Sequence, residues 1–285
     1  MTPNLKPILK WVGGKTQLLP VLRNLIISEG LHHPITNGEL PYIEPFIGGG
    51  ALFLDLQPSN AWINDKNEDL IRFYQTVRDY ASETITSFDS FVAAAKRSNL
   101  EQFYYVLRDA KNIVKLDYIH AARFYYLNKA CFNGLFRVNS SGEFNVPFNK
   151  SVTPPSIDCD NFYAVSNFLK QSNTRITNLD AVQLLRSIGA RQSFIYLDPP
   201  YVPVKKNSFV GYTSCIDKTF HEQLAEIAHK LAREGHYVLM SNSNCDEVHR
   251  LYASDTFRVH AVDARGSVNS NGNDRKRTET IICNF

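Results

Sequence analysis

The 285-residue sequence lacks most of the features that decide a protein's class at a glance. It has no run of about 18 apolar residues, and its first thirty residues do not form a secretory signal pattern. The five cysteines show no paired spacing, and the eight histidines show no metal-ligand spacing. Internal repeats and low-complexity segments are also absent. These absences argue against a membrane protein, a disulfide framework and a metal site. They predict a soluble, reduced, cytoplasmic protein with no obligate protein partner.

The sequence also lacks a large excess of either charge, with 31 Lys and Arg against 28 Asp and Glu. The formal net charge is +3 and the pI is about 8.5, so phosphate binding would depend on local clusters of Lys and Arg. The length is sufficient for one large α/β domain with a smaller insertion.

The most informative motif is Asp198-Pro199-Pro200-Tyr201, which follows the short apolar run 193–197. Such a run predicts a buried parallel strand, which the two prolines end. The Asp198 carboxylate is then expected to project, exposed, from the carboxyl edge of the sheet. A carboxylate and the carbonyl beside it can accept hydrogen bonds from an exocyclic amino group, while the Tyr201 ring stacks on the planar base that carries it. The motif predicts a site that modifies such an amino group, although Asp-Pro at a strand end is also compatible with a plain turn.

A second motif indicates a nucleotide-type cofactor. A strand-like segment at 40–46 runs through three glycines into a helical segment at 51–56, which is the first unit of a doubly wound sheet. The dinucleotide fingerprint needs a further glycine where Phe53 stands, so NAD is not favoured. Asp65, after the next strand at 61–63, is placed to accept both ribose hydroxyls of an adenosine. The alternative is that Asp65 caps the helix that starts near Asn67.

Near the amino terminus, Gly13-Gly14-Lys15 is compatible with a ligand-binding loop. It fails the phosphate-loop pattern because Leu9 stands where that motif needs glycine. Such a loop can still bind a carboxylate, for example that of a methionine moiety. A surface turn with a solvated Lys15 is the alternative.

Two further segments indicate nucleic acid. Residues 136–139 and 144–146 flank Ser140-Ser141-Gly142 and predict a β-hairpin, which fits the major groove of DNA. Arg and Asn are the side chains that contact guanine and adenine edges bidentately, although a hairpin without such a role is the alternative. The segment 265–277 holds four basic residues and one acidic residue, which indicates phosphate binding or an ordinary solvated loop. The segment 204–214 is expected to close over the substrate base.

The rest of the chain gives the architecture. Between residues 67 and 162, apolar side chains recur at helical spacing, and we expect them to form core. The stripes are Leu70, Phe73, Tyr74 and Val77; Phe103, Val106 and Leu107; and Ile119, Ala122, Phe124 and Tyr126. Strands are expected at 175–177, 194–198 and 237–240, a helix at 217–234, and a final antiparallel pair at 257–262 and 280–285.

Taken in order, these segments resemble the Dam-type DNA adenine-N6 methyltransferases, the alpha group of the D12 class. The resemblance covers nearly the whole chain, with one departure at Asn149, where the family usually has glycine. The matching positions are Leu9-Lys10-Trp11, Gly13-Gly14-Lys15, Glu44-Pro45-Phe46, Gly48, Gly50, Asp65-Lys66-Asn67, Asn128, Asn133-Gly134-Leu135, Arg137, Asn139, Gly142 to Phe148, Asp198 to Tyr201, Ser241-Asn242, Ser270-Asn271-Gly272 and Arg275-Lys276.

The resemblance implies an α/β fold with a Rossmann-like, doubly wound, seven-stranded sheet. It implies a catalytic domain formed by 1–66 and 163–285, and an inserted, mainly helical target-recognition domain at 67–162 that carries the hairpin. The implied cofactor is S-adenosylmethionine and the implied partner is double-stranded DNA. The implied site is GATC, with Lys10 on the first guanine, Arg137 on a guanine, Leu135 and Pro147 on thymine, and Phe132 as a wedge in the base stack.

The candidate residues are therefore as follows. The catalytic candidates are Asp198, Pro199, Pro200 and Tyr201. The cofactor candidates are Trp11, Gly13, Lys15, Phe46, Gly48, Gly50, Asp65, Asp180 and Asp198. The DNA-binding candidates are Lys10, Phe132, Asn133, Leu135, Arg137, Asn145, Pro147, Arg275, Lys276 and Arg277.

The expected reaction is direct methyl transfer to adenine N6 after base flipping, with no covalent enzyme intermediate. No Pro-Cys dipeptide, the nucleophile signature of cytosine-C5 methyltransferases, occurs in the chain. Two alternatives stay open: methylation of another planar amide or amino group in RNA or protein, and a catalytically inert DNA-binding protein. The sequence also leaves open whether the protein accompanies a restriction enzyme or acts alone.

Overall fold

The structure is a computed structural model that describes residues 4–110, 116–202, 218–265 and 276–285. The chain forms two compact units. One, here called the helical unit, comprises Met1–Gly14, Gly48–Asp55 and Asn67–Gln171. The other, here called the sheet unit, comprises Lys15–Ile47, Leu56–Lys66 and Ser172–Phe285. Both units are discontinuous in sequence, so each assembles segments that lie far apart in the chain. Residues 1–14, 48–55 and 163–171, which the sequence assigned to the catalytic domain, belong to the helical unit.

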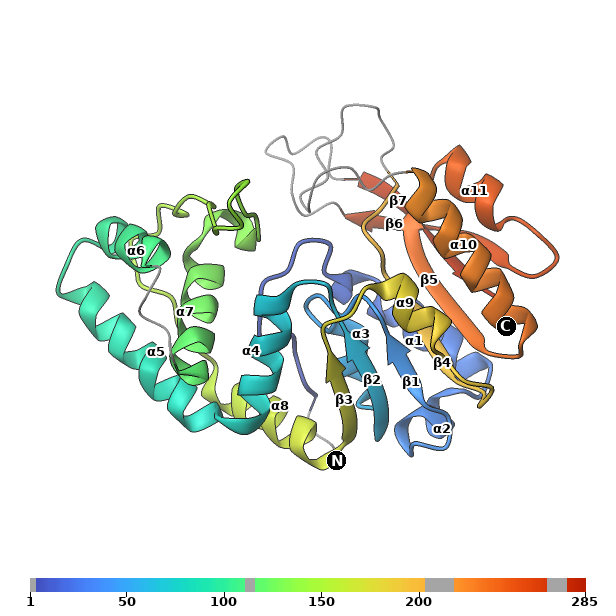
Figure 1. Ribbon diagram of the computed structural model, residues 1–285, viewed down its shortest axis with the longest axis horizontal. Coiled ribbons are helices and arrows are strands. Elements are labelled where there is room, and N and C mark those ends of the chain that lie inside the picture. Colours follow the sequence, from blue (N-terminus) through green and yellow to red (C-terminus); the bar gives the residue numbers. More distant parts are fainter. Residues whose placement is uncertain (1–3, 111–115, 203–217, 266–275) are drawn as a thin grey trace. The chain divides into compact units, whose positions relative to one another are not determined.

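The sheet unit is built on one seven-stranded sheet with the order β3-β2-β1-β4-β5-β7-β6 (Figure 1). The strands are β1 (Tyr42–Glu44), β2 (Asn60–Asn64), β3 (Asn173–Thr177), β4 (Phe194–Leu197), β5 (Tyr237–Ser243), β6 (Arg258–Arg265) and β7 (Lys276–Cys283). β1 to β5 pair in parallel, whereas β7 runs antiparallel to both β5 and β6. The predicted fold class is confirmed.

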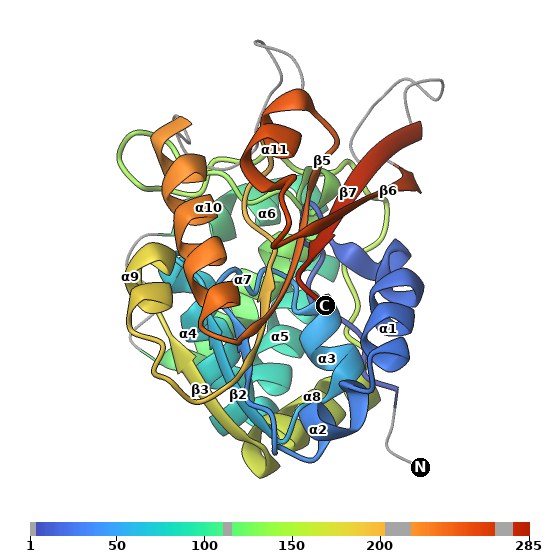
Figure 2. The ribbon, with the colours of Figure 1, turned by 90° about the vertical axis from the view of Figure 1, so that its right-hand side faces the viewer.

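Helices cover both faces of this sheet. Figure 2 shows α9 (Ala181–Arg186) and α10 (Lys218–Arg233) on one face and α1 (Leu19–Ser28) on the other. The first face is an aliphatic core, because side chains from α9, α10 and α11 (Asp246–Tyr252) pack on alternate residues of the strands. The unit also contains η1 (Lys15–Gln17) and α2 (His32–Thr36). The predicted stop signal of α10 is present, since Gly235 has a φ of 90°.

The helical unit contains α3 (Ala51–Leu56), α4 (Glu68–Asp79), α5 (Ala81–Lys96), α6 (Leu100–Asp109), α7 (Asp117–Ala130), η2 (Phe132–Gly134) and α8 (Cys159–Gln171). Its core is aromatic: Phe73 of α4 packs against Phe124 and Tyr125 of α7 and against Phe162 of α8. The prediction of core was wrong for Val106, which is 67% exposed, because α6 presents Tyr104 and Leu107 to the interior instead. Among the described residues, no helix combines the length and apolarity needed to cross a membrane.

Candidate functional site

The carboxyl edge of the sheet gathers the predicted catalytic and ribose-binding positions. β1 lies between β2 and β4, and these strands lead away from it in opposite directions along the sheet. Doubly wound sheets bind ligands outside the carboxyl ends of the strands at such a switch point. Phe46 follows β1, Asp65 follows β2 and Asp198 follows β4. Three elements far apart in sequence therefore bring these residues to one edge.

Asp198, the predicted catalytic carboxylate, is more buried than the sequence predicted. The Lys15 ammonium lies 2.8 Å from Asp198 Oδ1, and the Ser241 hydroxyl donates to the same oxygen at 2.8 Å. The side chains are 6% exposed for Lys15 and 19% for Asp198. Burial raises the pKa of Asp198, while the nearby Lys15 and the hydrogen bonds from Lys15 and Ser241 lower it. The expectation of an exposed carboxylate was wrong, and so was the alternative of a solvated Lys15.

Tyr201 is held from two sides. Its hydroxyl donates a 2.7 Å hydrogen bond to Glu279 Oε2 on β7, and the Lys15 ammonium lies 4.7 Å from the centre of its ring. The backbone that follows is fixed as well, because Asn242 Oδ1 accepts the Val202 N–H at 3.1 Å. Sequence reasoning missed Glu279, since it lies next to the basic segment that was assigned to phosphate binding.

A second carboxylate lies beneath the edge. Glu44 at the end of β1 is 2% exposed and accepts a 2.7 Å hydrogen bond from the Tyr42 hydroxyl. Burial raises the pKa of Glu44 well above its usual range, and the nearby Asp198 and Asp65 raise it further, against the lowering effects of Tyr42 and Lys15. Burial at the end of β1 therefore favours the protonated form of Glu44.

The other cofactor candidates of the sheet unit have distinct local roles. Asn67, not Asp65, caps α4, because its side chain accepts the Leu70 N–H at 3.1 Å. The sequence-based alternative for Asp65 was therefore wrong. Asp180 caps α9 by accepting the amide N–H groups of Val182 and Gln183. Its other oxygen lies 3.8 Å from the Lys66 ammonium. Phe46 packs edge-on against Phe220, with ring centres 6.3 Å apart.

The remaining cofactor candidates lie in the helical unit. Gly48 has a φ of 47°, and a Cβ atom there would lie 2.9 Å from Trp11 Cδ1. Only glycine lets the indole approach this closely. The Tyr74 hydroxyl donates to the Gly48 carbonyl at 3.1 Å, which fixes the loop. Gly13 and Gly50 also have positive φ, at 79° and 68°. The structure thus brings Trp11 and Gly48 into contact.

Lys10 lies beside the predicted recognition segment. Its backbone N–H donates to Asn128 Oδ1 at 2.9 Å, and the Asn128 amide donates back to the Lys10 carbonyl at 2.7 Å. Gly134 has a φ of 64°, and a Cβ atom there would lie 2.5 Å from Lys10 Cβ. The amino-terminal segment is therefore clamped onto α7 and η2, and the Lys10 side chain remains exposed.

The hairpin is shorter than predicted. Val138 and Phe144 form an isolated antiparallel bridge, and Gly142 turns the chain with a φ of 77°. No longer strand forms in this part of the described chain, although the Asn145 N–H donates to the Arg137 carbonyl at 3.0 Å and the Asn139 N–H donates to the Glu143 carbonyl at 2.9 Å. The Arg137 Nε–H donates to Asn145 Oδ1 at 2.7 Å, and its Nη2 donates to the Asn145 carbonyl at 3.2 Å.

The neighbouring recognition candidates are at the surface. Phe132 is 49% exposed, and its N–H donates to the Pro147 carbonyl at 2.9 Å. Asn133 and Pro147 are exposed too, while Leu135 is half-buried. Asn149, the departure from the family pattern, accepts the Ser151 N–H at 2.9 Å and so supports its own turn.

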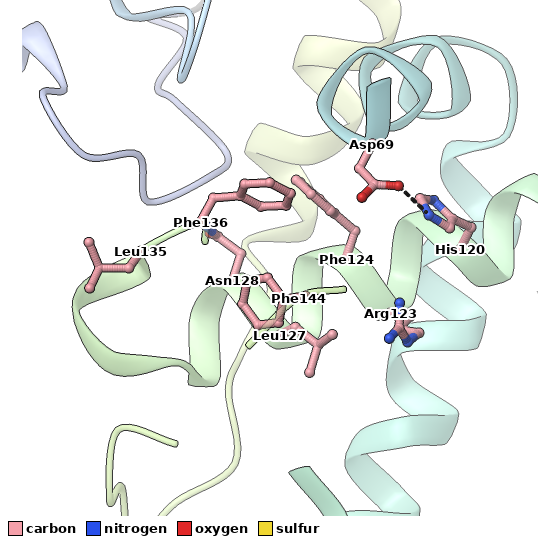
Figure 3. A pocket seen from close by; sticks show the side chains of 9 residues that line it. All are labelled: Asp69, His120, Arg123, Phe124, Leu127, Asn128, Leu135, Phe136 and Phe144. Atoms are coloured by element: carbon pink, nitrogen blue, oxygen red, sulfur yellow. Dashed lines mark ion pairs between the residues drawn. The ribbon is translucent and has the colours of Figure 1, made fainter. Parts of the chain in front are cut away.

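A small cavity lies behind the hairpin. It has a volume of about 20 Å³ and is lined on one side by Leu135, Phe136 and Phe144 (Figure 3). On the other side the His120 Nε2 atom lies 3.0 Å from Asp69, which lowers the pKa of Asp69. A cavity of this size holds about one water molecule, so it is no substrate site.

The basic segment is only partly described. Lys276 and Arg277 belong to β7, and Arg265 to β6, so the strands extend further than predicted. Arg275 and the segment 204–214 lie outside the described residues.

Comparison with known proteins gives the family. The sequence model of the family of D12 class N6 adenine-specific DNA methyltransferases matches residues 11–268. The chain is 38% identical to the Type II methyltransferase M.MjaIII of Methanocaldococcus jannaschii, covering 98% of this chain and 99% of that protein. It is 32% identical to the Type II methyltransferase M1.LlaDCHI of Lactococcus lactis subsp. cremoris, covering 99% and 96%. It is 30% identical to the DNA adenine methylase of Escherichia coli strain K12, covering 98% and 94%. This chain therefore belongs to the D12 class of N6 adenine-specific DNA methyltransferases, which take their methyl group from S-adenosylmethionine.

Proposed function

We propose that this enzyme methylates adenine N6 within GATC in double-stranded DNA, after flipping the target base out of the duplex. The observation that carries the proposal is the clamp of Lys10 onto Asn128 and Gly134. It joins residues that are 118 positions apart and sets Lys10 beside the segment that holds Arg137. Lys10 and Arg137 are both exposed cations of the helical unit. Two such cations suit the two guanines of a GATC duplex site, one of which lies on each strand.

Arg137 is prepared for guanine. The two hydrogen bonds to Asn145 orient the guanidinium, and the side chain stays exposed. An oriented guanidinium loses less rotational freedom when it binds the O6 and N7 atoms of guanine. We assign Asn145 the role of holding Arg137, together with any contact of its own to DNA.

Apolar contacts complete the proposed reader. Leu135 and Pro147 are assigned to the methyl groups of thymine, which apolar side chains recognise in the major groove. The exposed ring of Phe132 is assigned to the gap that the flipped adenine leaves. The Phe132 N–H donates to the Pro147 carbonyl, so the residue proposed to fill the gap is bonded directly to one proposed to contact thymine. Asn133 adds a polar contact beside them.

The residues at the sheet edge fit the cofactor. S-adenosylmethionine supplies an electrophilic methyl group on a sulfonium. Asp65 follows β2 at the switch point, and we assign it to the ribose hydroxyls; the cap of α4 is Asn67. Phe46 offers an aromatic surface, and Asp180 lies at the start of α9. Lys15 is assigned to the carboxylate end of the ligand while it contacts Asp198. Trp11, Gly13, Gly48 and Gly50, which belong to the helical unit, keep the cofactor assignment that the family resemblance gave them.

The proposed chemistry depends on positioning. Asp198 and the carbonyl of Pro199 accept hydrogen bonds from the adenine amino group and direct its lone pair, while Pro200 keeps the backbone rigid. The ammonium of Lys15 favours the ionised, accepting form of Asp198 against the effect of burial. Tyr201 stacks on the base. Roughly 7–11 kcal/mol of a barrier can come from such alignment.

The sheet unit is assigned to catalysis and the inserted segment 67–162 to target recognition. The basic residues Arg275, Lys276 and Arg277 are assigned to phosphates, which would strengthen binding to all sequences equally.

Methylation of GATC and its single-base variants tests the specificity. Arg137→Ala should lose about 1–3 kcal/mol of discrimination at one guanine and relax the preference at that base pair alone. The matched control is Arg97→Ala, an exposed arginine of the helical unit that hydrogen-bonds to its own helix. It should leave the preference unchanged. Equal loss on every substrate for Arg137→Ala would make it a phosphate contact and would exclude the hairpin as the reader.

A further inference from the structure

Glu279 contacts the catalytic tetrapeptide from a strand that the motifs do not include. Its Oε2 atom accepts the Tyr201 hydroxyl at 2.7 Å across 78 positions of sequence. A phenol bonded to a carboxylate at this distance makes a charge-assisted hydrogen bond, which is stronger than a neutral one.

The position of this hydrogen bond on the Tyr201 ring determines which rotations of the side chain it restricts. The hydroxyl of tyrosine lies on the axis about which its ring flips, so a bond there holds the tip of the side chain. The ring can still flip about that axis, but it cannot swing about χ1 without breaking the bond. The direction of the ring axis, and with it the place at which the ring meets a base, is thereby restricted.

The strand that carries Glu279 is paired on both sides. On β7, Glu279 pairs with Ser243 of β5 and with Val262 of β6, so strands flank it on both sides. The Lys15 ammonium lies 4.7 Å from the centre of the Tyr201 ring and also contacts Asp198. The ring is thus held at its tip by Glu279 and contacted by Lys15.

We propose that Glu279 is a positioning residue that holds Tyr201 in the orientation needed to stack on the flipped adenine. The proposal rests on the stacking role proposed for Tyr201. Glu279 touches neither the base nor the methyl group and acts only through the phenol.

The test compares Glu279→Leu, Glu279→Gln, Tyr201→Phe and the double variant Glu279→Leu/Tyr201→Phe. Glu279→Leu should lower kcat about tenfold, because misplaced reacting groups lose alignment. The KM for S-adenosylmethionine should change by less than about twofold, since the alignment of the base is what is lost. Glu279→Gln retains an acceptor and should keep at least about a third of kcat. The double variant should lose no more than Tyr201→Phe alone, because both changes remove one bond.

Duplex DNA with 2-aminopurine in place of the target adenine gives a direct readout. Its fluorescence rises when the base leaves the stack, and stacking on Tyr201 should quench part of that rise in the wild type but less in Glu279→Leu. The matched control is Asp263→Leu, which removes an exposed carboxylate from the adjacent β6 and should behave as wild type. Thermal unfolding of each variant checks that the fold persists.

The outcomes separate the two proposals. If Tyr201→Ala retains wild-type kcat, the role of Tyr201 itself is wrong. If Tyr201→Ala is inactive while Glu279→Leu keeps wild-type kcat and fluorescence, the role of Glu279 alone is wrong. The positioning role of Glu279 is also excluded if the losses of kcat caused by Glu279→Leu and Tyr201→Phe multiply in the double variant. It is excluded as well if kcat of Glu279→Gln is as low as that of Glu279→Leu.

Discussion

At the scale of single residues, the ion pair between Lys15 and Asp198 connects the proposed catalytic role of Asp198 to the stability of the fold. A lysine that is 6% exposed cannot regain full hydration if its carboxylate is removed. Breaking a buried pair from one side commonly costs about 3–5 kcal/mol, because an uncompensated charge remains. The residue predicted to hold the substrate amino group therefore also supports the local fold.

Asp198→Ala should lose more than nine-tenths of kcat and also destabilise the protein. We expect a loss of about 3 kcal/mol, the lower end of that range, because Asp198 is still 19% exposed. Incorporation of labelled methyl groups measures the first effect and urea unfolding the second. In the double variant Lys15→Met/Asp198→Ala, stability should largely return while activity stays lost. An unchanged urea midpoint for Asp198→Ala would show that the ion pair does not stabilise the edge.

At the scale of elements, the proposed recognition segment contains two glycines in different surroundings. Gly134 and Gly142 both have positive φ, at 64° and 77°. A Cβ at Gly142 would meet nothing within 4 Å, whereas one at Gly134 would meet Lys10 Cβ at 2.5 Å. Substitutions at Gly142 and Gly134 therefore distinguish the effect of backbone strain alone from the effect of strain combined with the loss of the Lys10 contact.

Gly142→Ala should cost about 1–2 kcal/mol of stability from the left-handed backbone and little specificity. Gly134→Ala bears the same strain and must also displace Lys10. We expect kcat/KM on GATC to fall at least tenfold further for Gly134→Ala, with cofactor affinity retained. Steady-state methylation and calorimetry measure both quantities. Equal effects of the two substitutions would remove Lys10 from the proposed reader.

At the scale of the whole molecule, the switch point between β2, β1 and β4 explains why the candidate residues Phe46, Asp65 and Asp198 lie at one edge of the sheet. The carboxyl ends of parallel strands point the same way, so residues that follow them converge. The amino ends of the same strands lie at the opposite edge.

Asp65→Ala should weaken the binding of S-adenosylmethionine about tenfold or more, since a hydrogen bond to a charged group contributes about 1.5–3 kcal/mol. DNA affinity should change little. Asn60→Ala, at the amino end of the same strand, is the matched control and should retain cofactor affinity. Calorimetry measures the affinity of both variants for S-adenosylmethionine. An unchanged affinity for Asp65→Ala would disprove the assignment of Asp65 to the ribose.

Features that depend on neighbours in sequence were predictable. The strand before Asp198, the glycine loop before α3 and the end of α10 at Gly235 follow from apolar runs, proline and glycine, whose effects are local. The seven-stranded fold followed from the family resemblance and was confirmed. Burial at a helix face was less predictable, as Val106 shows, because a rotation of the helix by a fraction of a turn decides which apolar residue faces the core.

The partners of the site residues were decided by the tertiary structure alone. Lys15 is the counter-ion of Asp198, Glu279 accepts the Tyr201 hydroxyl, and Asn128 clamps Lys10. The sequence by itself determined the strand, loop and turn patterns from which the candidate residues were chosen, because such patterns lie in adjacent positions. It could not determine what holds them, because each such contact closes a long loop. Only the packing of the whole chain selects which distant side chain completes it.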